Sequence, residues 1–485
     1  TMALRDSWQL YPKEFGFDEG SISVHPWPGH PVGYSGSWDY QARRELDPDN
    51  IWKLWYAHRQ SYYGTSLTFP QSYFDRIKQE IEKNPGQGSA DTYAATGLQS
   101  NAHGTAIHNE LLLALAPQDS PVEDAVRLAG VFQQNPHGIP DPQWIAASGA
   151  IWPLSPKDTK HFPRLESLMD AAWTWFYDSI CARNADYGMF NFLDGHTYNG
   201  TATATRQVWH RVWLNNHYDH AYMLWLMYAR SGEKRYFQMA RRHARHVVNI
   251  DTCHEYSKPG QFIYQHVPGG VFHCKGFHHW GGSAQLWDHM VCPDYQLLNY
   301  YLTGDRRYWD AFNEWRTSLT KLHTRPTWGR NGIYMLKAFN DAYEASGDPI
   351  LLAHRWDQAD HTVKLPFREQ HAMAFQPTVY PEYLRSVGDA AMRKRFLEYV
   401  DDLMAGKAHG TWPPFAFFTS AWQLTGNRKY MEYNAKFIAE KLSKWRERYT
   451  SMHLNMTPGL VSSLDSLRKV GITEEDIFKL QKVEK

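Results

Sequence analysis

From about residue 50 onward, apolar residues recur at helical spacing, and five glycines punctuate the pattern. Gly232, Gly304, Gly347, Gly388 and Gly426 each follow an apolar stretch, precede an acidic or amide residue, and have an apolar residue four positions later. Such a glycine is typical of the left-handed residue that ends a helix, and an Asp or Asn after it caps the next helix. Their spacings of 72, 43, 41 and 38 residues indicate a repeated helical hairpin with one insertion. We therefore expect an α-solenoid or an (α/α) toroid.

The beginning of the chain has a different pattern. Residues 21–28 alternate and are followed by several prolines and glycines, which predicts one or two strands and a loop. Because two strands do not form a stable sheet alone, they either pair with later loops or belong to a β-domain that precedes this chain. The expected organisation is a β-strand and loop segment over 1–49, a toroid over 50–450 and a C-terminal helical tail over 451–485.

The starts of the expected inner helices favour the toroid over the solenoid. Residues 213–220, 287–290 and 410–415, which precede three of the helices that end in glycine, concentrate Trp, His, Asn and Asp. A scaffold solenoid has no reason to place these residues at one end of its helices, whereas a toroid uses that end as the mouth of a cleft. The expected fold class is all-α dominated, an (α/α) toroid with a short N-terminal β segment.

Composition points to carbohydrate. The chain of 485 residues has 21 Trp and 25 His, and Phe, Trp and Tyr make up 15% of it; aromatic faces stack on sugars while polar neighbours bond the hydroxyls. Lys plus Arg and Asp plus Glu both number 51, which argues against nucleic acid or an anionic membrane surface as partner. A mean hydropathy of -0.60, with no apolar run near 18 residues, predicts no membrane span. The four cysteines form no CxxC, so neither a zinc ribbon nor a disulfide framework is indicated.

Four segments are rich in His, Asn and Tyr: 101–110, 209–220, 249–254 and 269–280. The first two are each expected to open an apolar helix. On a helix, Asn216 and His220 would share a face. None of the four matches a phosphate loop, a nucleophile elbow or a thermolysin-type zinc motif. His243, on the outer helix before the third segment, is expected to be solvated.

These segments, in this order, resemble the rhamnogalacturonan exolyase-like proteins of polysaccharide lyase family 26 and the related ulvan lyases. The resemblance runs from residue 8 to about 310, and the repeat continues it to about 445. One departure is that the family tends to have Lys-Thr-His-Glu at a helix start where this chain has Ile107-His108-Asn109-Glu110, so that Asn109 can occupy the family's His position. The segments that carry the resemblance are Trp8-Gln-Leu-Tyr-Pro-Lys-Glu, Ser21 to Pro28, Gly-Thr-Ala-Ile-His-Asn-Glu-Leu-Leu-Leu, Asn215 to Asp219, Asn249 to His254, and Asp288 through Leu302-Thr-Gly-Asp.

The resemblance implies a catalytic toroid that follows a β-domain and cleaves a uronate polysaccharide by β-elimination. That reaction needs a base at C5, a group that neutralises the uronate carboxylate, and a proton for the leaving O4. His and Tyr can move the protons, while Asn, protonated His, Arg or a cation can neutralise. The candidate catalytic residues are His217, Tyr218, Asn216, His108, Asn109 and His279. The candidate substrate-binding residues are Arg206, Arg211, Trp213, His220, His254, Trp280 and Trp412. Asp219 is interpreted as an orienting partner or helix-start charge.

A divalent cation, Zn²⁺ or Ca²⁺, is the one cofactor considered, with His273, His278 and His289 as its candidate ligands. Direct substrate contact by these histidines is the alternative. The expected partner is an anionic polysaccharide, either rhamnogalacturonan I or ulvan, with no nucleic acid and no membrane. The expected location is secreted or periplasmic, with the signal and an N-terminal domain lying outside this chain.

Three other functions are kept open. A toroid glycoside hydrolase would use two carboxylates, for which Asp194, Asp219, Asp251, Asp294 and Glu382 are available. A sugar epimerase of the α/α-barrel class would use paired His bases, and a non-catalytic polysaccharide-binding protein would explain the tryptophans alone. Ultraviolet-absorbing unsaturated product ends separate the lyase from all three.

Overall fold

A computed structural model describes most of the helical part of the chain and a short part of its beginning. The described residues are 1–10, 13–26, 106–134, 138–139, 141–151, 154–180, 192–194, 216, 219–255, 267–272, 284–286, 293–322, 325–327, 329–364, 379–407, 415–445 and 457–480.

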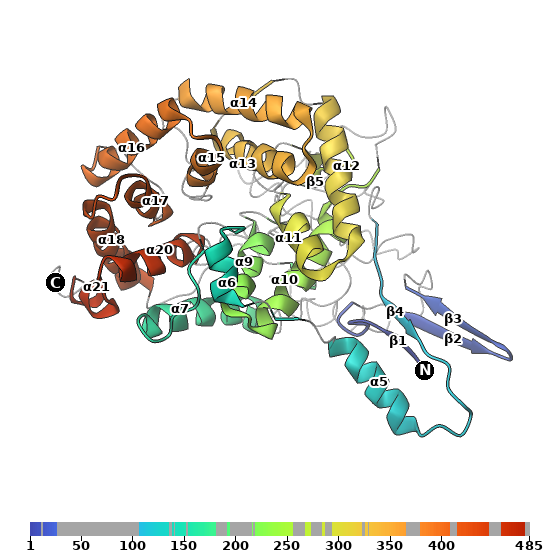
Figure 1. Cartoon of the computed structure of the whole chain (residues 1–485). Coiled ribbons are helices and arrows are strands. Elements are labelled where there is room, and N and C mark those ends of the chain that lie inside the picture. The colour runs from blue at the N-terminus through green and yellow to red at the C-terminus, as the bar shows by residue number, and fades with distance from the viewer. Residues whose placement is uncertain are drawn as a thin grey trace, which may run out of the picture.

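The helices form two concentric rings (Figure 1). The inner ring contains α9 (His220–Ser231), α11 (Asp294–Thr303), α13 (Gly329–Ser346), α15 (Val379–Val387), α17 (Phe415–Thr425) and α20 (Thr457–Lys469). The outer ring contains α10 (Lys234–His246), α12 (Arg306–Leu322), α14 (Pro349–Lys364), α16 (Ala390–Met404), α18 (Lys429–Trp445) and α21 (Glu474–Leu480). The inner helices from α9 to α17 each pack against the outer helix that follows, as in α9 with α10 and α13 with α14. The mostly helical α/α toroid expected from the sequence is confirmed.

The ring is closed by contacts between the last two helices of the chain and helices near its first inner helix, α9. The helix α20 packs against α17 and α9, and α21 packs against α18 and α7 (Pro163–Thr174). The Glu474 carboxylate accepts hydrogen bonds from the first backbone N–H groups of α7, at 2.8 Å. The helix α6 (Pro142–Ser148) packs against α9. Residues 457–480, which we expected to form a tail, are therefore part of the ring.

The five glycines end the inner helices as their pattern predicts. Their φ angles lie between 67° and 73°, and each donates its N–H to the carbonyl four residues earlier, at 2.6–3.1 Å. The side chains of Asp305, Asp348, Asp389 and Asn427 each accept a backbone N–H in the first turn of the next helix. Glu233 caps no helix in this way and pairs with Lys157 and Arg235 instead. The apolar residues four positions after the glycines are all buried: Tyr236, Tyr308, Leu351, Met392 and Tyr430.

The inner helix α9 is almost completely buried. Every residue from His220 to Arg230 is buried, because the helix has neighbours on all sides. The Arg230 guanidinium forms a two-pronged ion pair with Glu166 of α7, and both side chains are at most 1% exposed. Its Nε also donates to the Ser155 carbonyl at 2.9 Å. A buried charge is tolerable only when its partners are supplied in this way.

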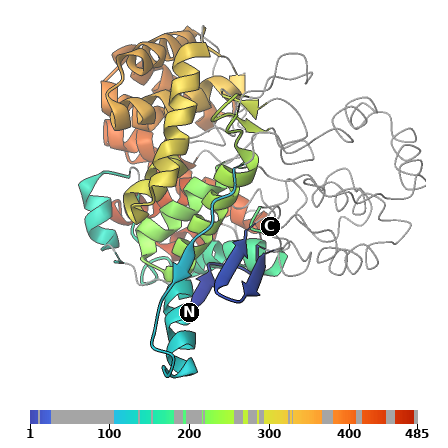
Figure 2. The ribbon, with the colours of Figure 1, turned by 90° about the vertical axis from the view of Figure 1, so that its right-hand side faces the viewer.

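The N-terminal strands lie outside the ring, together with α5 (Val122–Gln134) (Figure 1, Figure 2). The strands β2 (Glu14–Asp18) and β3 (Ser21–His25) form an antiparallel hairpin, which confirms a strand at Ser21. The strand β1 (Met2–Leu4) pairs with β4 (Leu111–Leu113), so a later segment does supply a partner. The strand β5 (Val271–Phe272) pairs with β6 (Ala284–Gln285) and packs against the π-helical turn η4 (Val247–Asp251).

One expectation about this region was wrong. Residues 106–113, where we expected an apolar helix, are extended and end in β4. The extended backbone lets the Glu110 carboxylate reach both Arg5 and Arg241, and the N–H of Arg5 donates to the Glu110 carbonyl at 3.1 Å. Tertiary pairing thus overrides the helical preference of this leucine-rich run. Among the described helices, none is long and apolar enough to cross a membrane.

Candidate active site

Two buried polar residues, Asn216 and Asp219, precede inner helix α9, and the N–H of Asp219 donates to the Asn216 carbonyl at 2.8 Å. Asn216 and Asp219 both have left-handed backbone, with φ of 59° and 58°, which costs a non-glycine residue about 1–2 kcal/mol. The Asn216 amide donates to Asp219 Oδ1 at 3.3 Å and its Oδ1 accepts from the N–H of Ala221 at 3.4 Å. Both side chains are completely buried. Strained residues of this kind cluster at active sites, so this turn is the first part of the candidate site.

The helix α9 begins at His220, and this changes two predictions. Asn216 is not helical, so the argument that it shares a helical face with His220 was wrong. The His220 ring is completely buried and lies edge-on to Trp173 and Phe176, with ring centroids 5.8 and 5.4 Å away. It lies inside an aromatic core in this structure. Asp219 occupies the N-cap position of α9, in agreement with its interpretation as a helix-start residue.

Buried carboxylates lie near this turn, at the ends of three neighbouring elements. Asp219 precedes α9, Asp251 ends the π-helical turn η4 (Val247–Asp251), and Asp294 begins α11. Two of these carboxylates act on the same tyrosine. Burial raises the pKa of Tyr295, and the charges of Asp219 and Asp251 raise it further. Burial likewise raises the pKa of Asp251 well above its ordinary range. The three carboxyl groups are therefore all shielded from solvent.

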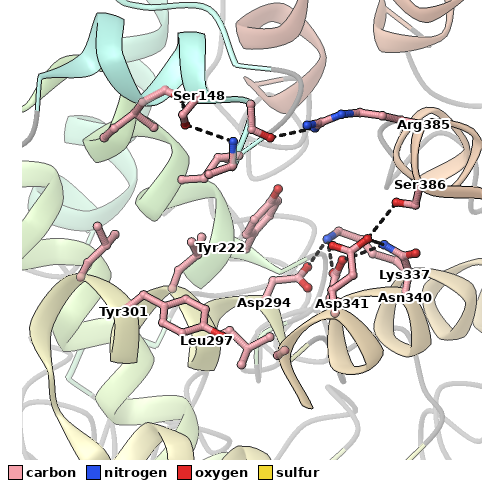
Figure 3. A pocket seen from close by; sticks show the side chains of 18 of the residues that line it. Ser148, Tyr222, Asp294, Leu297, Tyr301, Lys337, Asn340, Asp341, Arg385 and Ser386 are labelled. Carbon is pink, nitrogen blue, oxygen red and sulfur yellow. Dashed lines mark hydrogen bonds and ion pairs between the residues drawn. The ribbon is translucent and has the colours of Figure 1, made fainter. Parts of the chain in front are cut away.

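A cavity of about 900 Å³ runs along the inside of the ring. Its lining extends from the first turn of α9, at Tyr222, to the last turn of α13, and includes Arg385 of α15 (Figure 3). Two exposed aromatic residues, Trp144 and Tyr301, also line it, with exposed fractions of 68% and 58%. The Arg385 guanidinium donates to the Gly149 carbonyl at 2.8 Å. The cavity offers flat apolar faces and polar groups together, as sugar sites do.

A lysine and two carboxyl groups meet on the wall of this cavity (Figure 3). Lys337 Nζ lies 2.6 Å from Asp294 Oδ2 and 2.7 Å from Asp341 Oδ2, and 4.7 Å from the centre of the Tyr222 ring. Burial, and then the charge of Asp341, hold the pKa of Asp294 well above its usual range. Burial also acts to raise the pKa of Asp341, but Lys337 and a hydrogen bond from Asp294 lower it. Asp341 is therefore the more acidic of the two carboxyl groups.

Two histidines of the outer helix α10 are buried. We expected His243 to be solvated, but it is completely buried, bonds the Leu193 carbonyl, and lies edge-on to Tyr177. Burial lowers the pKa of His243 to about 3 and that of His246 to about 4. The expectation was wrong because α10 turns this face inward, toward η2 (Trp175–Ile180) and residues 192–194. Both rings are neutral at pH 7.

Other candidate residues lie among the outer helices. His254 bonds the Glu314 carboxylate of α12 and the Val248 carbonyl, and Arg307 approaches its Nε2 at 3.0 Å. His108 lies 4.0 Å from the Asp305 carboxylate, and burial lowers its pKa. Neither His254 nor His108 lines the central cavity, and neither does the half-buried Asn109. These three candidates therefore lie apart from Lys337 and its two carboxyl partners on the cavity wall.

The remaining candidates lie outside the described residues. They are His217, Tyr218, His279, Arg206, Arg211, Trp213, Trp280, Trp412, His273, His278 and His289.

Lys337 and Asp341 were not predicted from the sequence as site residues. A signal for them exists: they are four residues apart in α13, so they share a face, and the residues around them, from Tyr334 to Phe339, are almost entirely apolar and buried. Charged residues on a buried face of a helix are rarely placed there without a partner. That signal could have identified the pair as part of a polar site.

The fold and the cavity define this molecule as a mostly helical α/α toroid. Residues 135–335 match the family described as the PcRGLX-like protein C-terminal alpha/alpha toroid domain. Over 225 residues the chain is 29% identical to the uncharacterized protein YetA of Bacillus subtilis (strain 168); this alignment covers 45% of the chain and 24% of YetA. The part of the chain that aligns therefore spans about a quarter of that curated relative. The family match bears out the predicted toroid.

Proposed function

We propose that this chain is the toroid of a carbohydrate-active enzyme and that it cleaves a rhamnose- and uronate-containing polysaccharide by β-elimination. The match to a PcRGLX-like toroid domain suggests carbohydrate processing. The cavity with exposed Trp144 and Tyr301 supports it, because sugars stack on such side chains. The elimination reaction and the choice of polymer are proposals that go beyond the family match.

The observation that carries the lyase proposal is the strained turn before α9. Two non-glycine residues in left-handed backbone, Asn216 and Asp219, flank His217 and Tyr218 in the sequence. Residues in sparsely populated backbone regions cluster at active sites. An imidazole and a phenol between a buried amide and a buried carboxylate supply the residue types that proton abstraction and return require. We assign His217 and Tyr218 the proton transfers, and Asn216 the support of that turn or contact with the uronate carboxylate.

The hydrolase alternative needs two carboxyl groups about 5–5.5 or 6.5–9.5 Å apart, with the sugar between them. Asp294 and Asp341 are the carboxyl groups that meet on the wall of the described cavity, and they hydrogen-bond to each other and share Lys337. Groups in direct contact leave no room for a sugar ring between them. Their spacing favours a supporting role over that of a glycosidase pair.

The test is incubation with rhamnogalacturonan I and with ulvan, recording unsaturated uronate by ultraviolet absorbance. His217→Ala, Tyr218→Phe and Asn216→Ala are compared with the parent, and each must unfold at the parent's temperature. Loss of a catalytic acid or base lowers turnover by about 10²–10⁴-fold. His161→Ala is the matched control, because its ring is exposed and pairs with Asp158 at the start of α7.

The proposal predicts that His161→Ala keeps parent turnover while His217→Ala or Tyr218→Phe loses it. If all three turn variants keep near-parent turnover, the reaction is elimination but its centre lies elsewhere. If the parent releases reducing ends without the absorbance, it is a hydrolase and the lyase proposal is wrong.

A further inference from the structure

Three buried side chains from separate segments of the chain converge on one point. Asp194 comes from residues 192–194, His246 is the last residue of α10, and Asp251 ends η4. Their exposed fractions are 5%, 4% and 0%. One potential ligand atom from each lies within 4.8 Å of the other two. The mechanism proposed above uses none of them.

The distances in this cluster fit ligands of one ion better than direct hydrogen bonds. His246 Nε2 lies 3.7 Å from Asp194 Oδ2 and 3.5 Å from Asp251 Oδ2, whereas N–H···O bonds are about 2.7–3.2 Å long. Bonds of about 2.0–2.2 Å from zinc to nitrogen and oxygen separate two ligands of a tetrahedron by roughly 3.3–3.6 Å. Both distances from Nε2 lie close to that spacing.

The charges in the cluster also suit a divalent ion. His246 contributes a neutral ring at neutral pH, and two carboxylates balance the charge of one dication. Two buried carboxylates in one place otherwise repel each other and lose their hydration, which is costly.

We propose that Asp194, His246 and Asp251 bind a divalent transition-metal ion, with Zn²⁺ the best fit. One imidazole and two carboxylates are a ligand set that zinc accepts, and three protein ligands leave one position for water or for another side chain. Ca²⁺ fits less well, because it takes six to eight oxygen ligands. This site is distinct from the cation that the sequence analysis assigned to His273, His278 and His289, and it does not depend on the proposed reaction.

The ion would fix the base of the candidate active site. It would tie residues 192–194 to the end of α10 and to η4, which continues into Thr252, a hydrogen-bond partner of Tyr295. The Asp219 carboxylate in turn acts electrostatically on Tyr295, and Asp219 is the N-cap residue of α9. The ion therefore supports the segments around Tyr295 and contacts no reacting atom in this assignment.

The test is metal content and metal-dependent stability of the protein purified without chelator and without a histidine tag. Elemental analysis after dialysis against Zn²⁺ is expected to find about one zinc per chain in the parent, and removal by chelator to lower the melting temperature reversibly. Asp251→Asn and Asp194→Asn are expected to lose the zinc. Asp294→Asn, a buried aspartate outside the cluster, is the matched control and is expected to keep it, and so is His289→Ala.

A second readout covers the case in which a variant folds poorly. Replacement of zinc by Co²⁺ in the parent is expected to give the visible absorption of a four-coordinate oxygen and nitrogen site, displaced by stoichiometric Zn²⁺. Parent protein with no stoichiometric metal and no cobalt spectrum would overturn the proposal. Zinc that persists in folded Asp194→Asn and Asp251→Asn but disappears in His289→Ala would overturn it as well, in favour of the other histidines.

Discussion

Replacing Lys337 with methionine removes the positive charge that Asp294 and Asp341 share. The lysine and Asp294 side chains are 3% and 4% exposed, and both N···O distances are below 2.8 Å, so solvent does little to screen the loss. Breaking a buried ion pair from one side costs about 3–5 kcal/mol. A loss of about 4 kcal/mol reduces the folding equilibrium constant roughly 10³-fold, since 1.4 kcal/mol is tenfold.

The stability that Lys337→Met loses should be larger at neutral pH than in acid. In the parent, burial holds the folded-state pKa of Asp294 well above 3.8, whereas Lys337 holds that of Asp341 below it. Because Lys337 lowers the pKa of both groups, its loss is expected to raise both folded-state values. A carboxyl with a raised folded pKa favours the folded state below its unfolded pKa and loses that stability as the pH rises toward the folded pKa. The parent has a lowered Asp341 pKa, so this residue contributes stability above 3.8 that is lost on acidification. The deficit of Lys337→Met is therefore largest at pH 7 and shrinks toward pH 4.

The assay is urea unfolding followed by tryptophan fluorescence at pH 7 and pH 5. Lys469→Met is the control: this lysine is 59% exposed and pairs with Asp465 one turn away, so its loss should cost at most about 0.5 kcal/mol. Adding Asp294→Asn and Asp341→Asn to Lys337→Met is expected to restore part of the stability at pH 7. A cost below about 1 kcal/mol, or an equal cost at both pH values, would refute the reasoning.

Three further changes test the packing of the ring, each by the free energy of unfolding. Gly269→Ala places a Cβ 2.2 Å from the Trp315 backbone at a φ of +80° and is expected to cost about 3 kcal/mol or more; a cost below 1 kcal/mol would contradict the close approach. Gly347→Ala meets open space at a φ of +67°, so only backbone strain of about 1–2 kcal/mol is expected, and a larger cost would indicate a contact that the structure lacks. Arg230→Met leaves the Glu166 carboxylate buried without its charge partner and is expected to cost about 3–5 kcal/mol at pH 7; a loss within 0.5 kcal/mol would show that the pair is not buried in solution.

The sequence predicted the ring because its signal is local. A glycine at the end of each inner helix, followed by Asp or Asn, needs only its own backbone to adopt the left-handed turn, and Gly347 with Asp348 does so. The buried residue four positions later follows from the same helical geometry. The hairpin period then restricts the fold to a solenoid or a toroid, and the polar helix starts favour the toroid.

The parts that the sequence did not predict depend on partners far apart in the chain. Leu111–Leu113 is a strand because it pairs with Met2–Leu4, and no property of the leucines alone indicates this. His243 is buried because residues 192–194 cover it, and a helical pattern cannot show which outer face is covered. The site residues were predicted at the starts of helices, whereas Lys337 and Asp341 lie within one.

The most direct test of the central claim is the product formed from a uronate polysaccharide by the full chain. Mass spectrometry and ultraviolet absorbance are recorded together on the soluble fragments of rhamnogalacturonan I and ulvan. β-Elimination predicts fragments with an absorbing unsaturated uronate end and no water added across the cleaved bond. Fragments that carry the added water and lack the absorbance would contradict the account, and so would unchanged chain length at a protein concentration that binds the polymer.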